Sequence, residues 1–199
     1  IDIDFILSPF SLKALSWSEK LKVNAIKIGS GEVNNTLLLN AINNNLDNNF
    51  PVIISSGMST YKELDIAIKI LKKNNRLVIP MQCTSKYPTN PEDWGLENID
   101  IMKKRYQGFI GFSDHSGDIY ASLGAMAKGA DVLEVHLVFS KKCFGPDTSS
   151  SVTIEQMKQI VEGTRSLKKS LNKSFDKNQP TKEIITMKKL FEKKIVAKE

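Results

Sequence analysis

The sequence predicts an α/β protein built around a parallel β-sheet. Short apolar runs, each typical of a buried strand, alternate with helical segments. The polar residues that end these runs recur about every 23 to 29 residues, which is the length of one βα unit. They are Lys27, Ser55, Thr84, Ser113 and His136. Because most runs are continuously apolar rather than alternating, a parallel sheet covered on both faces is favoured.

The individual elements follow from these runs and from the polar stretches between them. Strands are expected at the apolar runs 5–7, 25–28, 51–54, 77–81, 108–112 and 132–135. Helices are expected at 11–20, 35–44, 60–73, 96–104, 116–129 and 154–171. A loop at 139–150 follows the sixth strand. After the last of these helices we expect a polar linker at 172–179 and an amphipathic segment at 181–192.

Helix starts are marked by capping-box spacing, in which Ser or Thr is followed three residues later by Glu or Gln. The pairs are Thr60/Glu63, Thr153/Gln156 and Ser16/Glu19, the last within the helix at 11–20. The helix that starts at Thr60 also places Leu64, Ala67, Ile68 and Leu71 on one face, which is the pattern of a helix packed on a core.

The formal net charge of +6 comes from the C-terminal segment. Residues 158–199 contain 12 Lys/Arg against 5 Asp/Glu, and the remainder is close to neutral. Nucleic-acid binding usually combines basic residues with several aromatic ones, and this segment has only Phe175 and Phe191. We therefore expect an exposed lysine-rich segment and no nucleic-acid partner. No apolar run is long enough to cross a membrane, and two cysteines favour a reducing, cytoplasmic setting.

Two architectures fit this alternation. A (β/α)₈ barrel has eight strands and usually about 250 residues, so six strands in 199 residues would make an incomplete barrel. A doubly wound sheet fits the strand count. Its usual signature is weak, however, because Gly29-Ser30-Gly31 matches neither a dinucleotide fingerprint nor a P-loop. The residues alone leave both architectures open.

Hydroxyl groups and one lysine gather at the predicted strand ends. They are Ser8, Lys27, Ser30, Ser55, Thr84, Ser85 and Ser113. A lysine supplies charge and hydroxyls supply hydrogen bonds, which is the composition of a phosphate pocket. Since an unpaired buried charge is costly, Lys27 inside the run AIKIGSG implies an anionic partner, unless its ammonium group reaches solvent at the rim.

Both histidines of the chain, His115 and His136, follow neighbouring predicted strands. Two imidazoles at adjacent strand ends could share a divalent ion such as Mn²⁺, Fe²⁺ or Zn²⁺, with water or a carboxylate completing an open site. The alternative is two unrelated, hydrogen-bonded histidines, because there is no local ligand motif. A reactive role for Cys83 is disfavoured, since no histidine or lysine adjoins it in sequence.

Seven short blocks, taken in order, resemble the sialic acid synthase family, which includes N-acetylneuraminate, legionaminate and pseudaminate synthases. The blocks are SPF at 8–10, KIGSGE at 27–32, ISSGM at 54–58, CTSKYPT at 83–89, GFSDHS at 111–116, EVH at 134–136 and GPD at 145–147. No single block is specific, but their order over most of the chain is.

The resemblance implies a TIM barrel followed by a small antifreeze-like domain. Residues 1–175 would then form the barrel from about its third to its eighth strand, and residues 176–199 would lead toward the second domain. The family's first two strands and its antifreeze-like domain would lie outside this sequence. The resemblance also implies a domain-swapped homodimer in the full-length protein.

The reaction implied by the resemblance joins phosphoenolpyruvate to an open-chain N-acylated mannosamine-type sugar. It yields a nine-carbon 2-keto acid and phosphate. His115 and His136 would hold a divalent metal, typically Mn²⁺. The remaining roles, also implied by the resemblance, divide into two groups. Phosphoenolpyruvate would be held by Lys27, Ser8, Ser30, Ser55 and Ser113. Glu32 would handle protons, Ser85 and Tyr87 would lie beside the substrates, and Asp147 would bind sugar hydroxyls.

Several positions depart from the family's pattern, including Gln82, Lys86, Ser8 and Thr148. The loop after His136, LVFSKKCFGPD, also differs from the commoner N-acetylneuraminate form. Its bulky Phe144 would suit a 6-deoxy, diacetamido sugar of the legionaminate type. Two other readings stay open, namely another phosphoenolpyruvate- or metal-dependent aldol synthase on this barrel and a non-catalytic barrel remnant.

Overall fold

Seven parallel strands form one curled sheet in the computed structural model, which describes residues 3–193 apart from the side chain of Asn74. The strands are β1 (Ile6–Leu7), β2 (Ala25–Ile28), β3 (Val52–Ser55), β4 (Val78–Cys83), β5 (Gly111–Asp114), β6 (Val132–Leu137) and β7 (Ser151–Val152). They lie in sequential order, β1 to β7, and each neighbouring pair is parallel.

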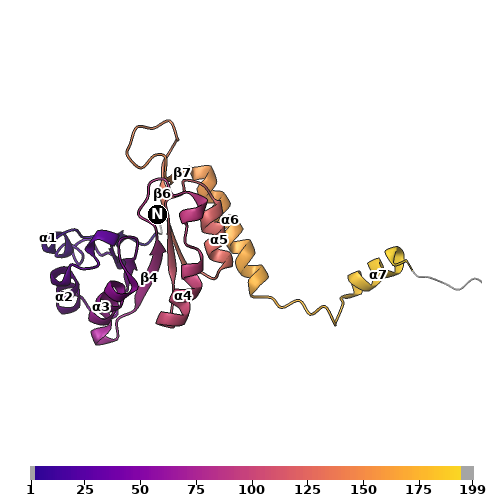
Figure 1. Cartoon of the computed structure of the whole chain (residues 1–199), viewed down its shortest axis with the longest axis horizontal. Helices are drawn as coiled ribbons and strands as arrows, with labels where there is room; N and C mark the ends of the chain where they lie inside the picture. Colours follow the sequence, from indigo (N-terminus) through magenta and orange to yellow (C-terminus); the bar gives the residue numbers. More distant parts are fainter. Residues whose placement is uncertain (1–2, 194–199) are drawn as a thin grey trace, which may run out of the picture.

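This strand order decides between the two architectures. A doubly wound sheet reverses its strand order at a switch point, whereas a barrel adds each strand beside the previous one. The sheet curls into an open half-barrel with helices along it (Figure 1). The prediction of an incomplete (β/α)₈ barrel is therefore confirmed, and the doubly wound alternative is wrong.

Five helices connect β1 to β6 in turn, as expected for parallel strands. They are α1 (Leu12–Leu15), α2 (Thr36–Asn45), α3 (Tyr61–Leu71), α4 (Glu97–Tyr106) and α5 (Tyr120–Ala127). A loop joins β6 to β7, and the helices α6 (Ile154–Leu171) and α7 (Lys182–Phe191) follow β7. Short 3₁₀ turns occur at Ser30–Glu32, Lys72–Asn74 and Pro91–Asp93. In Figure 1, α1 to α3 lie beside the early strands and α4 to α6 beside the later ones. The capping boxes predicted at Thr60 and Thr153 start α3 and α6.

The main core lies between the strands and the helices. Alternate strand residues point to this side and pack on apolar helix residues that are almost fully buried. The strand contribution includes Ile26, Ile28, Val52, Ile54 and Phe112. The opposite, concave face carries a smaller apolar layer of Ile53, Ile79, Met81 and Val132. Above this layer, toward the carboxyl ends of the strands, the concave face becomes polar.

A buried arginine closes the end of α2. Arg76 is 2% exposed, and its guanidinium group donates hydrogen bonds to four backbone carbonyl oxygens and to the side chain of Asn43. The carbonyls belong to Ile42, Leu46, Asp47 and Phe50. The carbonyls of Ile42 and Asp47 also accept backbone hydrogen bonds, so Arg76 is a second donor there. For the carbonyls of Leu46 and Phe50, just beyond the end of the helix, Arg76 supplies the donor that the backbone does not.

Three elements differ from the prediction. The strand expected at 108–112 lies at Gly111–Asp114, because its pairing with β6 begins only at Gly111, so Ser113 lies within β5 and not after it. Helix α1 ends at Leu15, not at residue 20, because the hydroxyl of Ser16 donates to the carbonyl of Lys13 and so closes the helix instead of capping a second half. A seventh strand, β7, was missed, and the count of about six strands was too low by this one. At two residues, β7 is too short to show a strand pattern, and it is defined only by its pairing with β6.

The C-terminal segment follows the prediction as far as the structure describes it. Residues 172–181 connect α6 to α7, which stands apart from the barrel as an exposed, lysine-rich helix (Figure 1). The rest of the predicted linker, 194–199, lies outside the described residues. A domain boundary at residue 175 stays a prediction. Within residues 3–193 there is no helix with the length and apolar character needed to cross a membrane.

Candidate active site

The candidate site lies on the concave face, at the carboxyl ends of β2 to β6. The alternation of strand side chains brings Lys27, Ser55, Ser113, Glu134 and His136 to this face, opposite to the main core. The register places Cys83 beside Ser113 and Ser113 beside Glu134 across β4, β5 and β6. This edge of a parallel sheet is where α/β barrels carry their active sites.

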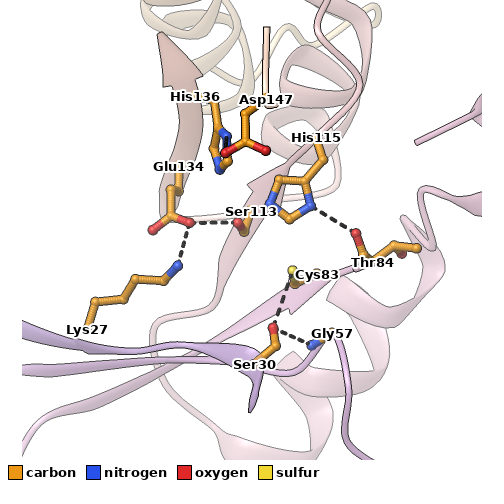
Figure 2. Close-up of polar contacts among 10 residues, drawn as sticks. All are labelled: Lys27, Ser30, Gly57, Cys83, Thr84, Ser113, His115, Glu134, His136 and Asp147. Atoms are coloured by element: carbon orange, nitrogen blue, oxygen red, sulfur yellow. Dashed lines mark hydrogen bonds and ion pairs between the residues drawn. The ribbon is translucent and has the colours of Figure 1, made fainter. Parts of the chain in front are cut away.

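A three-residue polar network occupies the centre of the site (Figure 2). The ammonium group of Lys27 lies 2.7 Å from Oε1 of Glu134, and the hydroxyl of Ser113 donates to the same oxygen at 2.7 Å. The sequence predicted an anionic partner for Lys27. The structure supplies one from the chain itself, because Glu134 neutralises the lysine in the absence of a ligand.

Beside this network, small side chains converge on Gly57. The hydroxyl of Ser30 accepts a hydrogen bond from the Gly57 amide at 3.1 Å and lies 3.7 Å from the sulfur of Cys83. A Cβ atom at Gly57 would lie 2.5 Å from the hydroxyl of Ser85 and 2.9 Å from both Cys83 Sγ and Ser30 Oγ. Burial raises the pKa of the Cys83 thiol, which favours the protonated form over the nucleophilic thiolate. Cys83 therefore lines the site as a neutral side chain.

Two hydroxyl groups here are buried without a partner. The Oγ atoms of Ser55 and Ser85 make no hydrogen bond, and both belong to residues predicted to contact substrates. A buried hydroxyl without a partner costs free energy, so such groups are expected to have one when the site is filled. Together with Lys27, they are candidate hydrogen-bond donors for a small anion.

The two histidines meet above this anion pocket. Their ring centroids are 5.1 Å apart and the rings are close to perpendicular. Nδ1 of His115 lies 2.9 Å from the backbone carbonyl of Thr84. A carbonyl can only accept, so Nδ1 carries the proton and Nε2 of the neutral ring keeps a free lone pair. Burial also lowers the pKa of His115, which favours this neutral form.

Asp114 fixes the backbone that carries His115. Its carboxylate accepts hydrogen bonds from the Ser116 amide and the Ser122 hydroxyl, both at 2.7 Å. Asp114 and His115 are both nearly fully buried. Thr84 therefore fixes the direction of the His115 ring, and Asp114 fixes the backbone that follows it.

The donor set fits a divalent cation in an open site. Two imidazoles on neighbouring strands can bind one ion, and water or a substrate oxygen can fill the other positions. Asp147 lies near the pair, with Oδ2 3.5 Å from Nδ1 of His136. Within the described part of the chain there is no group of three or more His, Cys, Asp or Glu residues placed to hold a metal. The two histidines would thus be the protein ligands, and the choice of Mn²⁺ stays a prediction.

An aromatic side chain covers the histidine pair. The ring of Tyr87 stacks on His115 with centroids 4.2 Å apart and lies 5.9 Å from His136. Burial raises the pKa of Tyr87, as do the neighbouring Cys83 and Asp147, so its hydroxyl is protonated at neutral pH. Tyr87 is nonetheless 47% exposed, so a ligand entering from solvent would meet it first.

The loop at 138–150, between β6 and β7, carries Asp147 over the site. Its Lys141 ammonium group donates to the backbone carbonyls of Gly117 at 2.9 Å and Ser149 at 3.2 Å, and also to that of Ser151. Gly117 has a φ of 73° and begins the turn after His115. Lys141 thus ties the loop to the turn that follows the His115 strand.

Comparison with known proteins identifies the family. A family model described as the NeuB family matches residues 1–176. The chain belongs to the NeuB family. The resemblance to sialic acid synthases inferred from the seven sequence blocks is therefore confirmed.

Three relatives illustrate where this NeuB-family chain stands. It is 37% identical over 172 residues to an uncharacterized protein of Methanocaldococcus jannaschii, covering 86% of this chain and 50% of that one. It is 30% identical over 203 residues to the N,N'-diacetyllegionaminic acid synthase of Campylobacter jejuni, covering 99% and 60%. A solved N-acetylneuraminic acid (sialic acid) synthetase from Leptospira borgpetersenii, in complex with citrate, superposes with a TM-score of 0.82 at 30% identity, covering 97% of this chain and 67% of that one. The chain thus spans 50% to 60% of the length of the two curated relatives.

Most of the predicted site residues of the NeuB-family chain come together, and two stand slightly apart. The same region of the concave face is lined by Lys27, Ser30, Ser55, Ser85, Ser113, Tyr87, Asp147 and the two histidines. Ser8 follows the edge strand β1 and is half-buried. Glu32 lies in the turn after β2, and its carboxylate accepts a hydrogen bond from Asn35 at 2.7 Å instead of contacting Lys27.

Sequence reasoning did not assign a role to Glu134 or to Gly57. Glu134 lies two residues before His136, and the two-residue period of a strand puts both on one face, so this signal was present in the sequence. The close approach at Gly57 had no sequence signal, because it depends on Ser30, Cys83 and Ser85 from other segments.

Proposed function

We propose that this chain provides the catalytic barrel of a sialic acid-type synthase, which condenses phosphoenolpyruvate with an N-acylated mannosamine-type sugar. One observation carries the proposal. A lysine and several hydroxyl groups lie beside two imidazoles that can bind a divalent ion, at the carboxyl ends of the barrel strands. Such a site can hold a phosphorylated carboxylate and an aldehyde next to each other.

The anionic substrate would be bound by the pocket around Lys27. Ser113 and Ser30 lie within or beside its hydrogen-bond network, and the unpaired hydroxyls of Ser55 and Ser85 are available for the phosphate and carboxylate oxygens. Ser8 would contribute from the edge of the sheet. The positive charge of Lys27 would count most as phosphate departs, because charge then builds on the leaving oxygen.

The sugar would enter on the side of His115 and His136. A divalent ion held by these residues would polarise the aldehyde carbonyl as a Lewis acid. Tyr87 would pack against the sugar, since its ring covers the histidines and is partly exposed. Asp147 would hydrogen-bond sugar hydroxyls from the loop above. Glu32 is the candidate for proton transfer near the reacting carbons.

The chemical steps balance with water as the third reactant. Carbon 3 of phosphoenolpyruvate attacks the aldehyde carbon, a carbon–carbon bond forms, and the carbonyl oxygen takes a proton to become a hydroxyl. Water then adds to carbon 2 and loses a proton. The carbon 2 bond to the phosphate oxygen breaks, which leaves a 2-keto acid and inorganic phosphate.

The identity of the sugar is proposed from the loop at 138–150. Phe144 is fully exposed in this loop, and Phe139 is nearly so. Exposed apolar side chains near a site favour a substrate with apolar substituents, so we propose a 6-deoxy, diacetamido sugar over N-acetylmannosamine. The Campylobacter jejuni relative is an N,N'-diacetyllegionaminic acid synthase, which is in line with this choice.

Phosphate release tests the proposal. Phosphoenolpyruvate and Mn²⁺ are supplied with either N-acetylmannosamine or its 2,4-diacetamido-6-deoxy analogue, with and without a chelator. The assay uses this chain and, in parallel, protein expressed from its full reading frame. We expect release that requires sugar, stops with chelator and is lost in Lys27→Met. Absence of release from folded full-length protein with both sugars would instead favour an aldol synthase for a shorter aldehyde or a non-catalytic barrel. The homodimer and the cytoplasmic location remain predictions.

A further inference from the structure

Glu134 occupies the place where a ligand anion is expected. One of its carboxylate oxygens receives both the Lys27 ammonium and the Ser113 hydroxyl, each at 2.7 Å. These two donors are the groups that the proposed function assigns to phosphoenolpyruvate. Two anion-binding groups of the pocket are therefore bound to an internal carboxylate.

The contact reaches across the hollow of the half-barrel. Lys27 lies on β2 and Glu134 on β6, with β3, β4 and β5 between them in the sheet. Figure 2 shows the two side chains extending toward each other over this concave face. An ion pair in this position closes the space through which an anion must reach Lys27.

The ion pair is partly buried, but its side chains are not enclosed on all sides. The side chains of Lys27 and Glu134 are 20% and 28% exposed, so both can change rotamer without unfolding the core. A partly buried ion pair is stronger than a surface pair, yet it can exchange one anion for another of higher charge. Both features suit a competitor that a substrate can displace.

We propose that Glu134 acts as an internal competitor that sets the affinity and selectivity of the anion pocket. The inference rests on the proposed function of the pocket and names a residue that determines its specificity. A phosphate dianion offers more charge and more acceptor oxygens than the carboxylate, so it can displace Glu134 from Lys27 and Ser113. A simple monocarboxylate offers no gain over Glu134. Glu134 thereby excludes weakly binding anions, because it raises the intrinsic affinity that any anion needs to occupy the pocket.

The proposal predicts by how much Glu134 weakens the binding of an anion. After displacement, the Glu134 carboxylate stays within several ångströms of the bound anion and repels it. At an effective dielectric constant between those of protein and water, one such charge weakens binding about tenfold. Glu134→Gln removes this repulsion, keeps the shape of the side chain and keeps an oxygen that can accept from Ser113.

The test is a titration with inorganic phosphate, and separately with acetate, followed through backbone amide resonances of this chain. NMR gives both the dissociation constant and the residues that respond. The variants are Glu134→Gln, Lys27→Met and a matched control, Asp65→Asn, which removes one negative charge from an ion pair outside the site. Thermal unfolding of each variant checks that the fold is kept.

We expect phosphate to shift amides near Gly57 and Ser113, to bind about tenfold more tightly to Glu134→Gln, and to lose binding in Lys27→Met. Asp65→Asn should match the parent chain. Acetate should also bind more tightly to Glu134→Gln, because the same internal competitor is removed for both anions.

Two other outcomes separate this inference from the proposed function. If Lys27→Met abolishes phosphate binding but folded Glu134→Gln binds as the parent does or more weakly, the competitor role is wrong and the anion pocket stands. If neither variant changes binding, or if the shifts fall on the lysine-rich segment after residue 158, the anion pocket itself is wrong.

Discussion

Replacing Gly57 by alanine is the most direct test of how side chains pack around the anion pocket. Gly57→Ala would place Cβ 2.5 Å from Ser85 Oγ and 2.9 Å from both Cys83 Sγ and Ser30 Oγ, closer than real Cβ contacts come. The φ angle of Gly57 is outside the left-handed region, so the backbone itself accepts alanine. The cost is therefore steric, and it falls on the side chains of the pocket.

The size of the effect follows from these contacts. Overpacking a buried position typically costs about 1–3 kcal/mol. Moving Ser30 also weakens the hydrogen bond that its hydroxyl accepts from the Gly57 amide, which contributes about 1 kcal/mol. We expect the free energy of unfolding to fall by about 2–3 kcal/mol and phosphate affinity to fall about tenfold, because the displaced hydroxyls no longer converge.

Equilibrium unfolding in urea and the amide-detected phosphate titration measure the two effects. Gly31→Ala is the matched control, since its added Cβ would meet only Met58 Sδ, at 4.0 Å, and should change stability by less than about 0.5 kcal/mol. A Gly57→Ala chain as stable as the parent would refute the convergence of side chains on Gly57. A destabilised chain with unchanged phosphate affinity would confirm the packing of side chains around Gly57. It would also show that these side chains do not bind phosphate.

Three further predictions concern residues outside the anion pocket. Arg76→Met should lower the free energy of unfolding by about 2–4 kcal/mol in urea titrations, because hydrogen bonds to four carbonyl groups are lost and two of these groups, those of Leu46 and Phe50, have no backbone donor in their place; a loss below about 1 kcal/mol would contradict this. Hydrogen bonds from Arg105 hold the pKa of Asp65 below its usual value, so the ionised carboxylate stabilises the fold. Asp65→Asn should therefore cost up to about 1 kcal/mol near pH 7, a small value because the pair is exposed. The difference from the parent should shrink as pH falls below about 4, through the unfolded value and toward the lower folded pKa; a difference that is constant with pH in parallel unfolding curves would rule this out. Lys141→Met should raise amide hydrogen exchange in the 138–150 loop about tenfold, because three carbonyl contacts are lost; unchanged exchange would mean that the loop is held by other contacts.

Local signals in the sequence determined most of the elements. The capping boxes at Thr60 and Thr153 predicted the starts of α3 and α6, and both are present. The βα spacing predicted that Lys27, Ser113 and His136 share one edge of a parallel sheet. These features depend on hydrogen bonds and side-chain directions within a few residues, so they can be read from a short stretch of sequence.

The strand order and the partners within the site were decided only by the tertiary structure. Whether the βα units form a barrel or a doubly wound sheet depends on which strands become neighbours, which no single unit specifies. Three other features likewise join distant segments. They are the pairing of β7 with β6, the contacts of Arg76 at the end of α2, and the approach of Ser30, Cys83 and Ser85 to Gly57.

The ion pair at the centre of the site shows why such contacts cannot be predicted from the sequence alone. Lys27 and Glu134 are 107 residues apart, and each alone has the pattern of an ordinary polar residue on a buried strand. They meet because the curl of the sheet turns β2 and β6 toward a common interior, where an unpaired charge would be costly. The sequence by itself determined which side chains face the concave side, and the curvature of the sheet decided which of them touch.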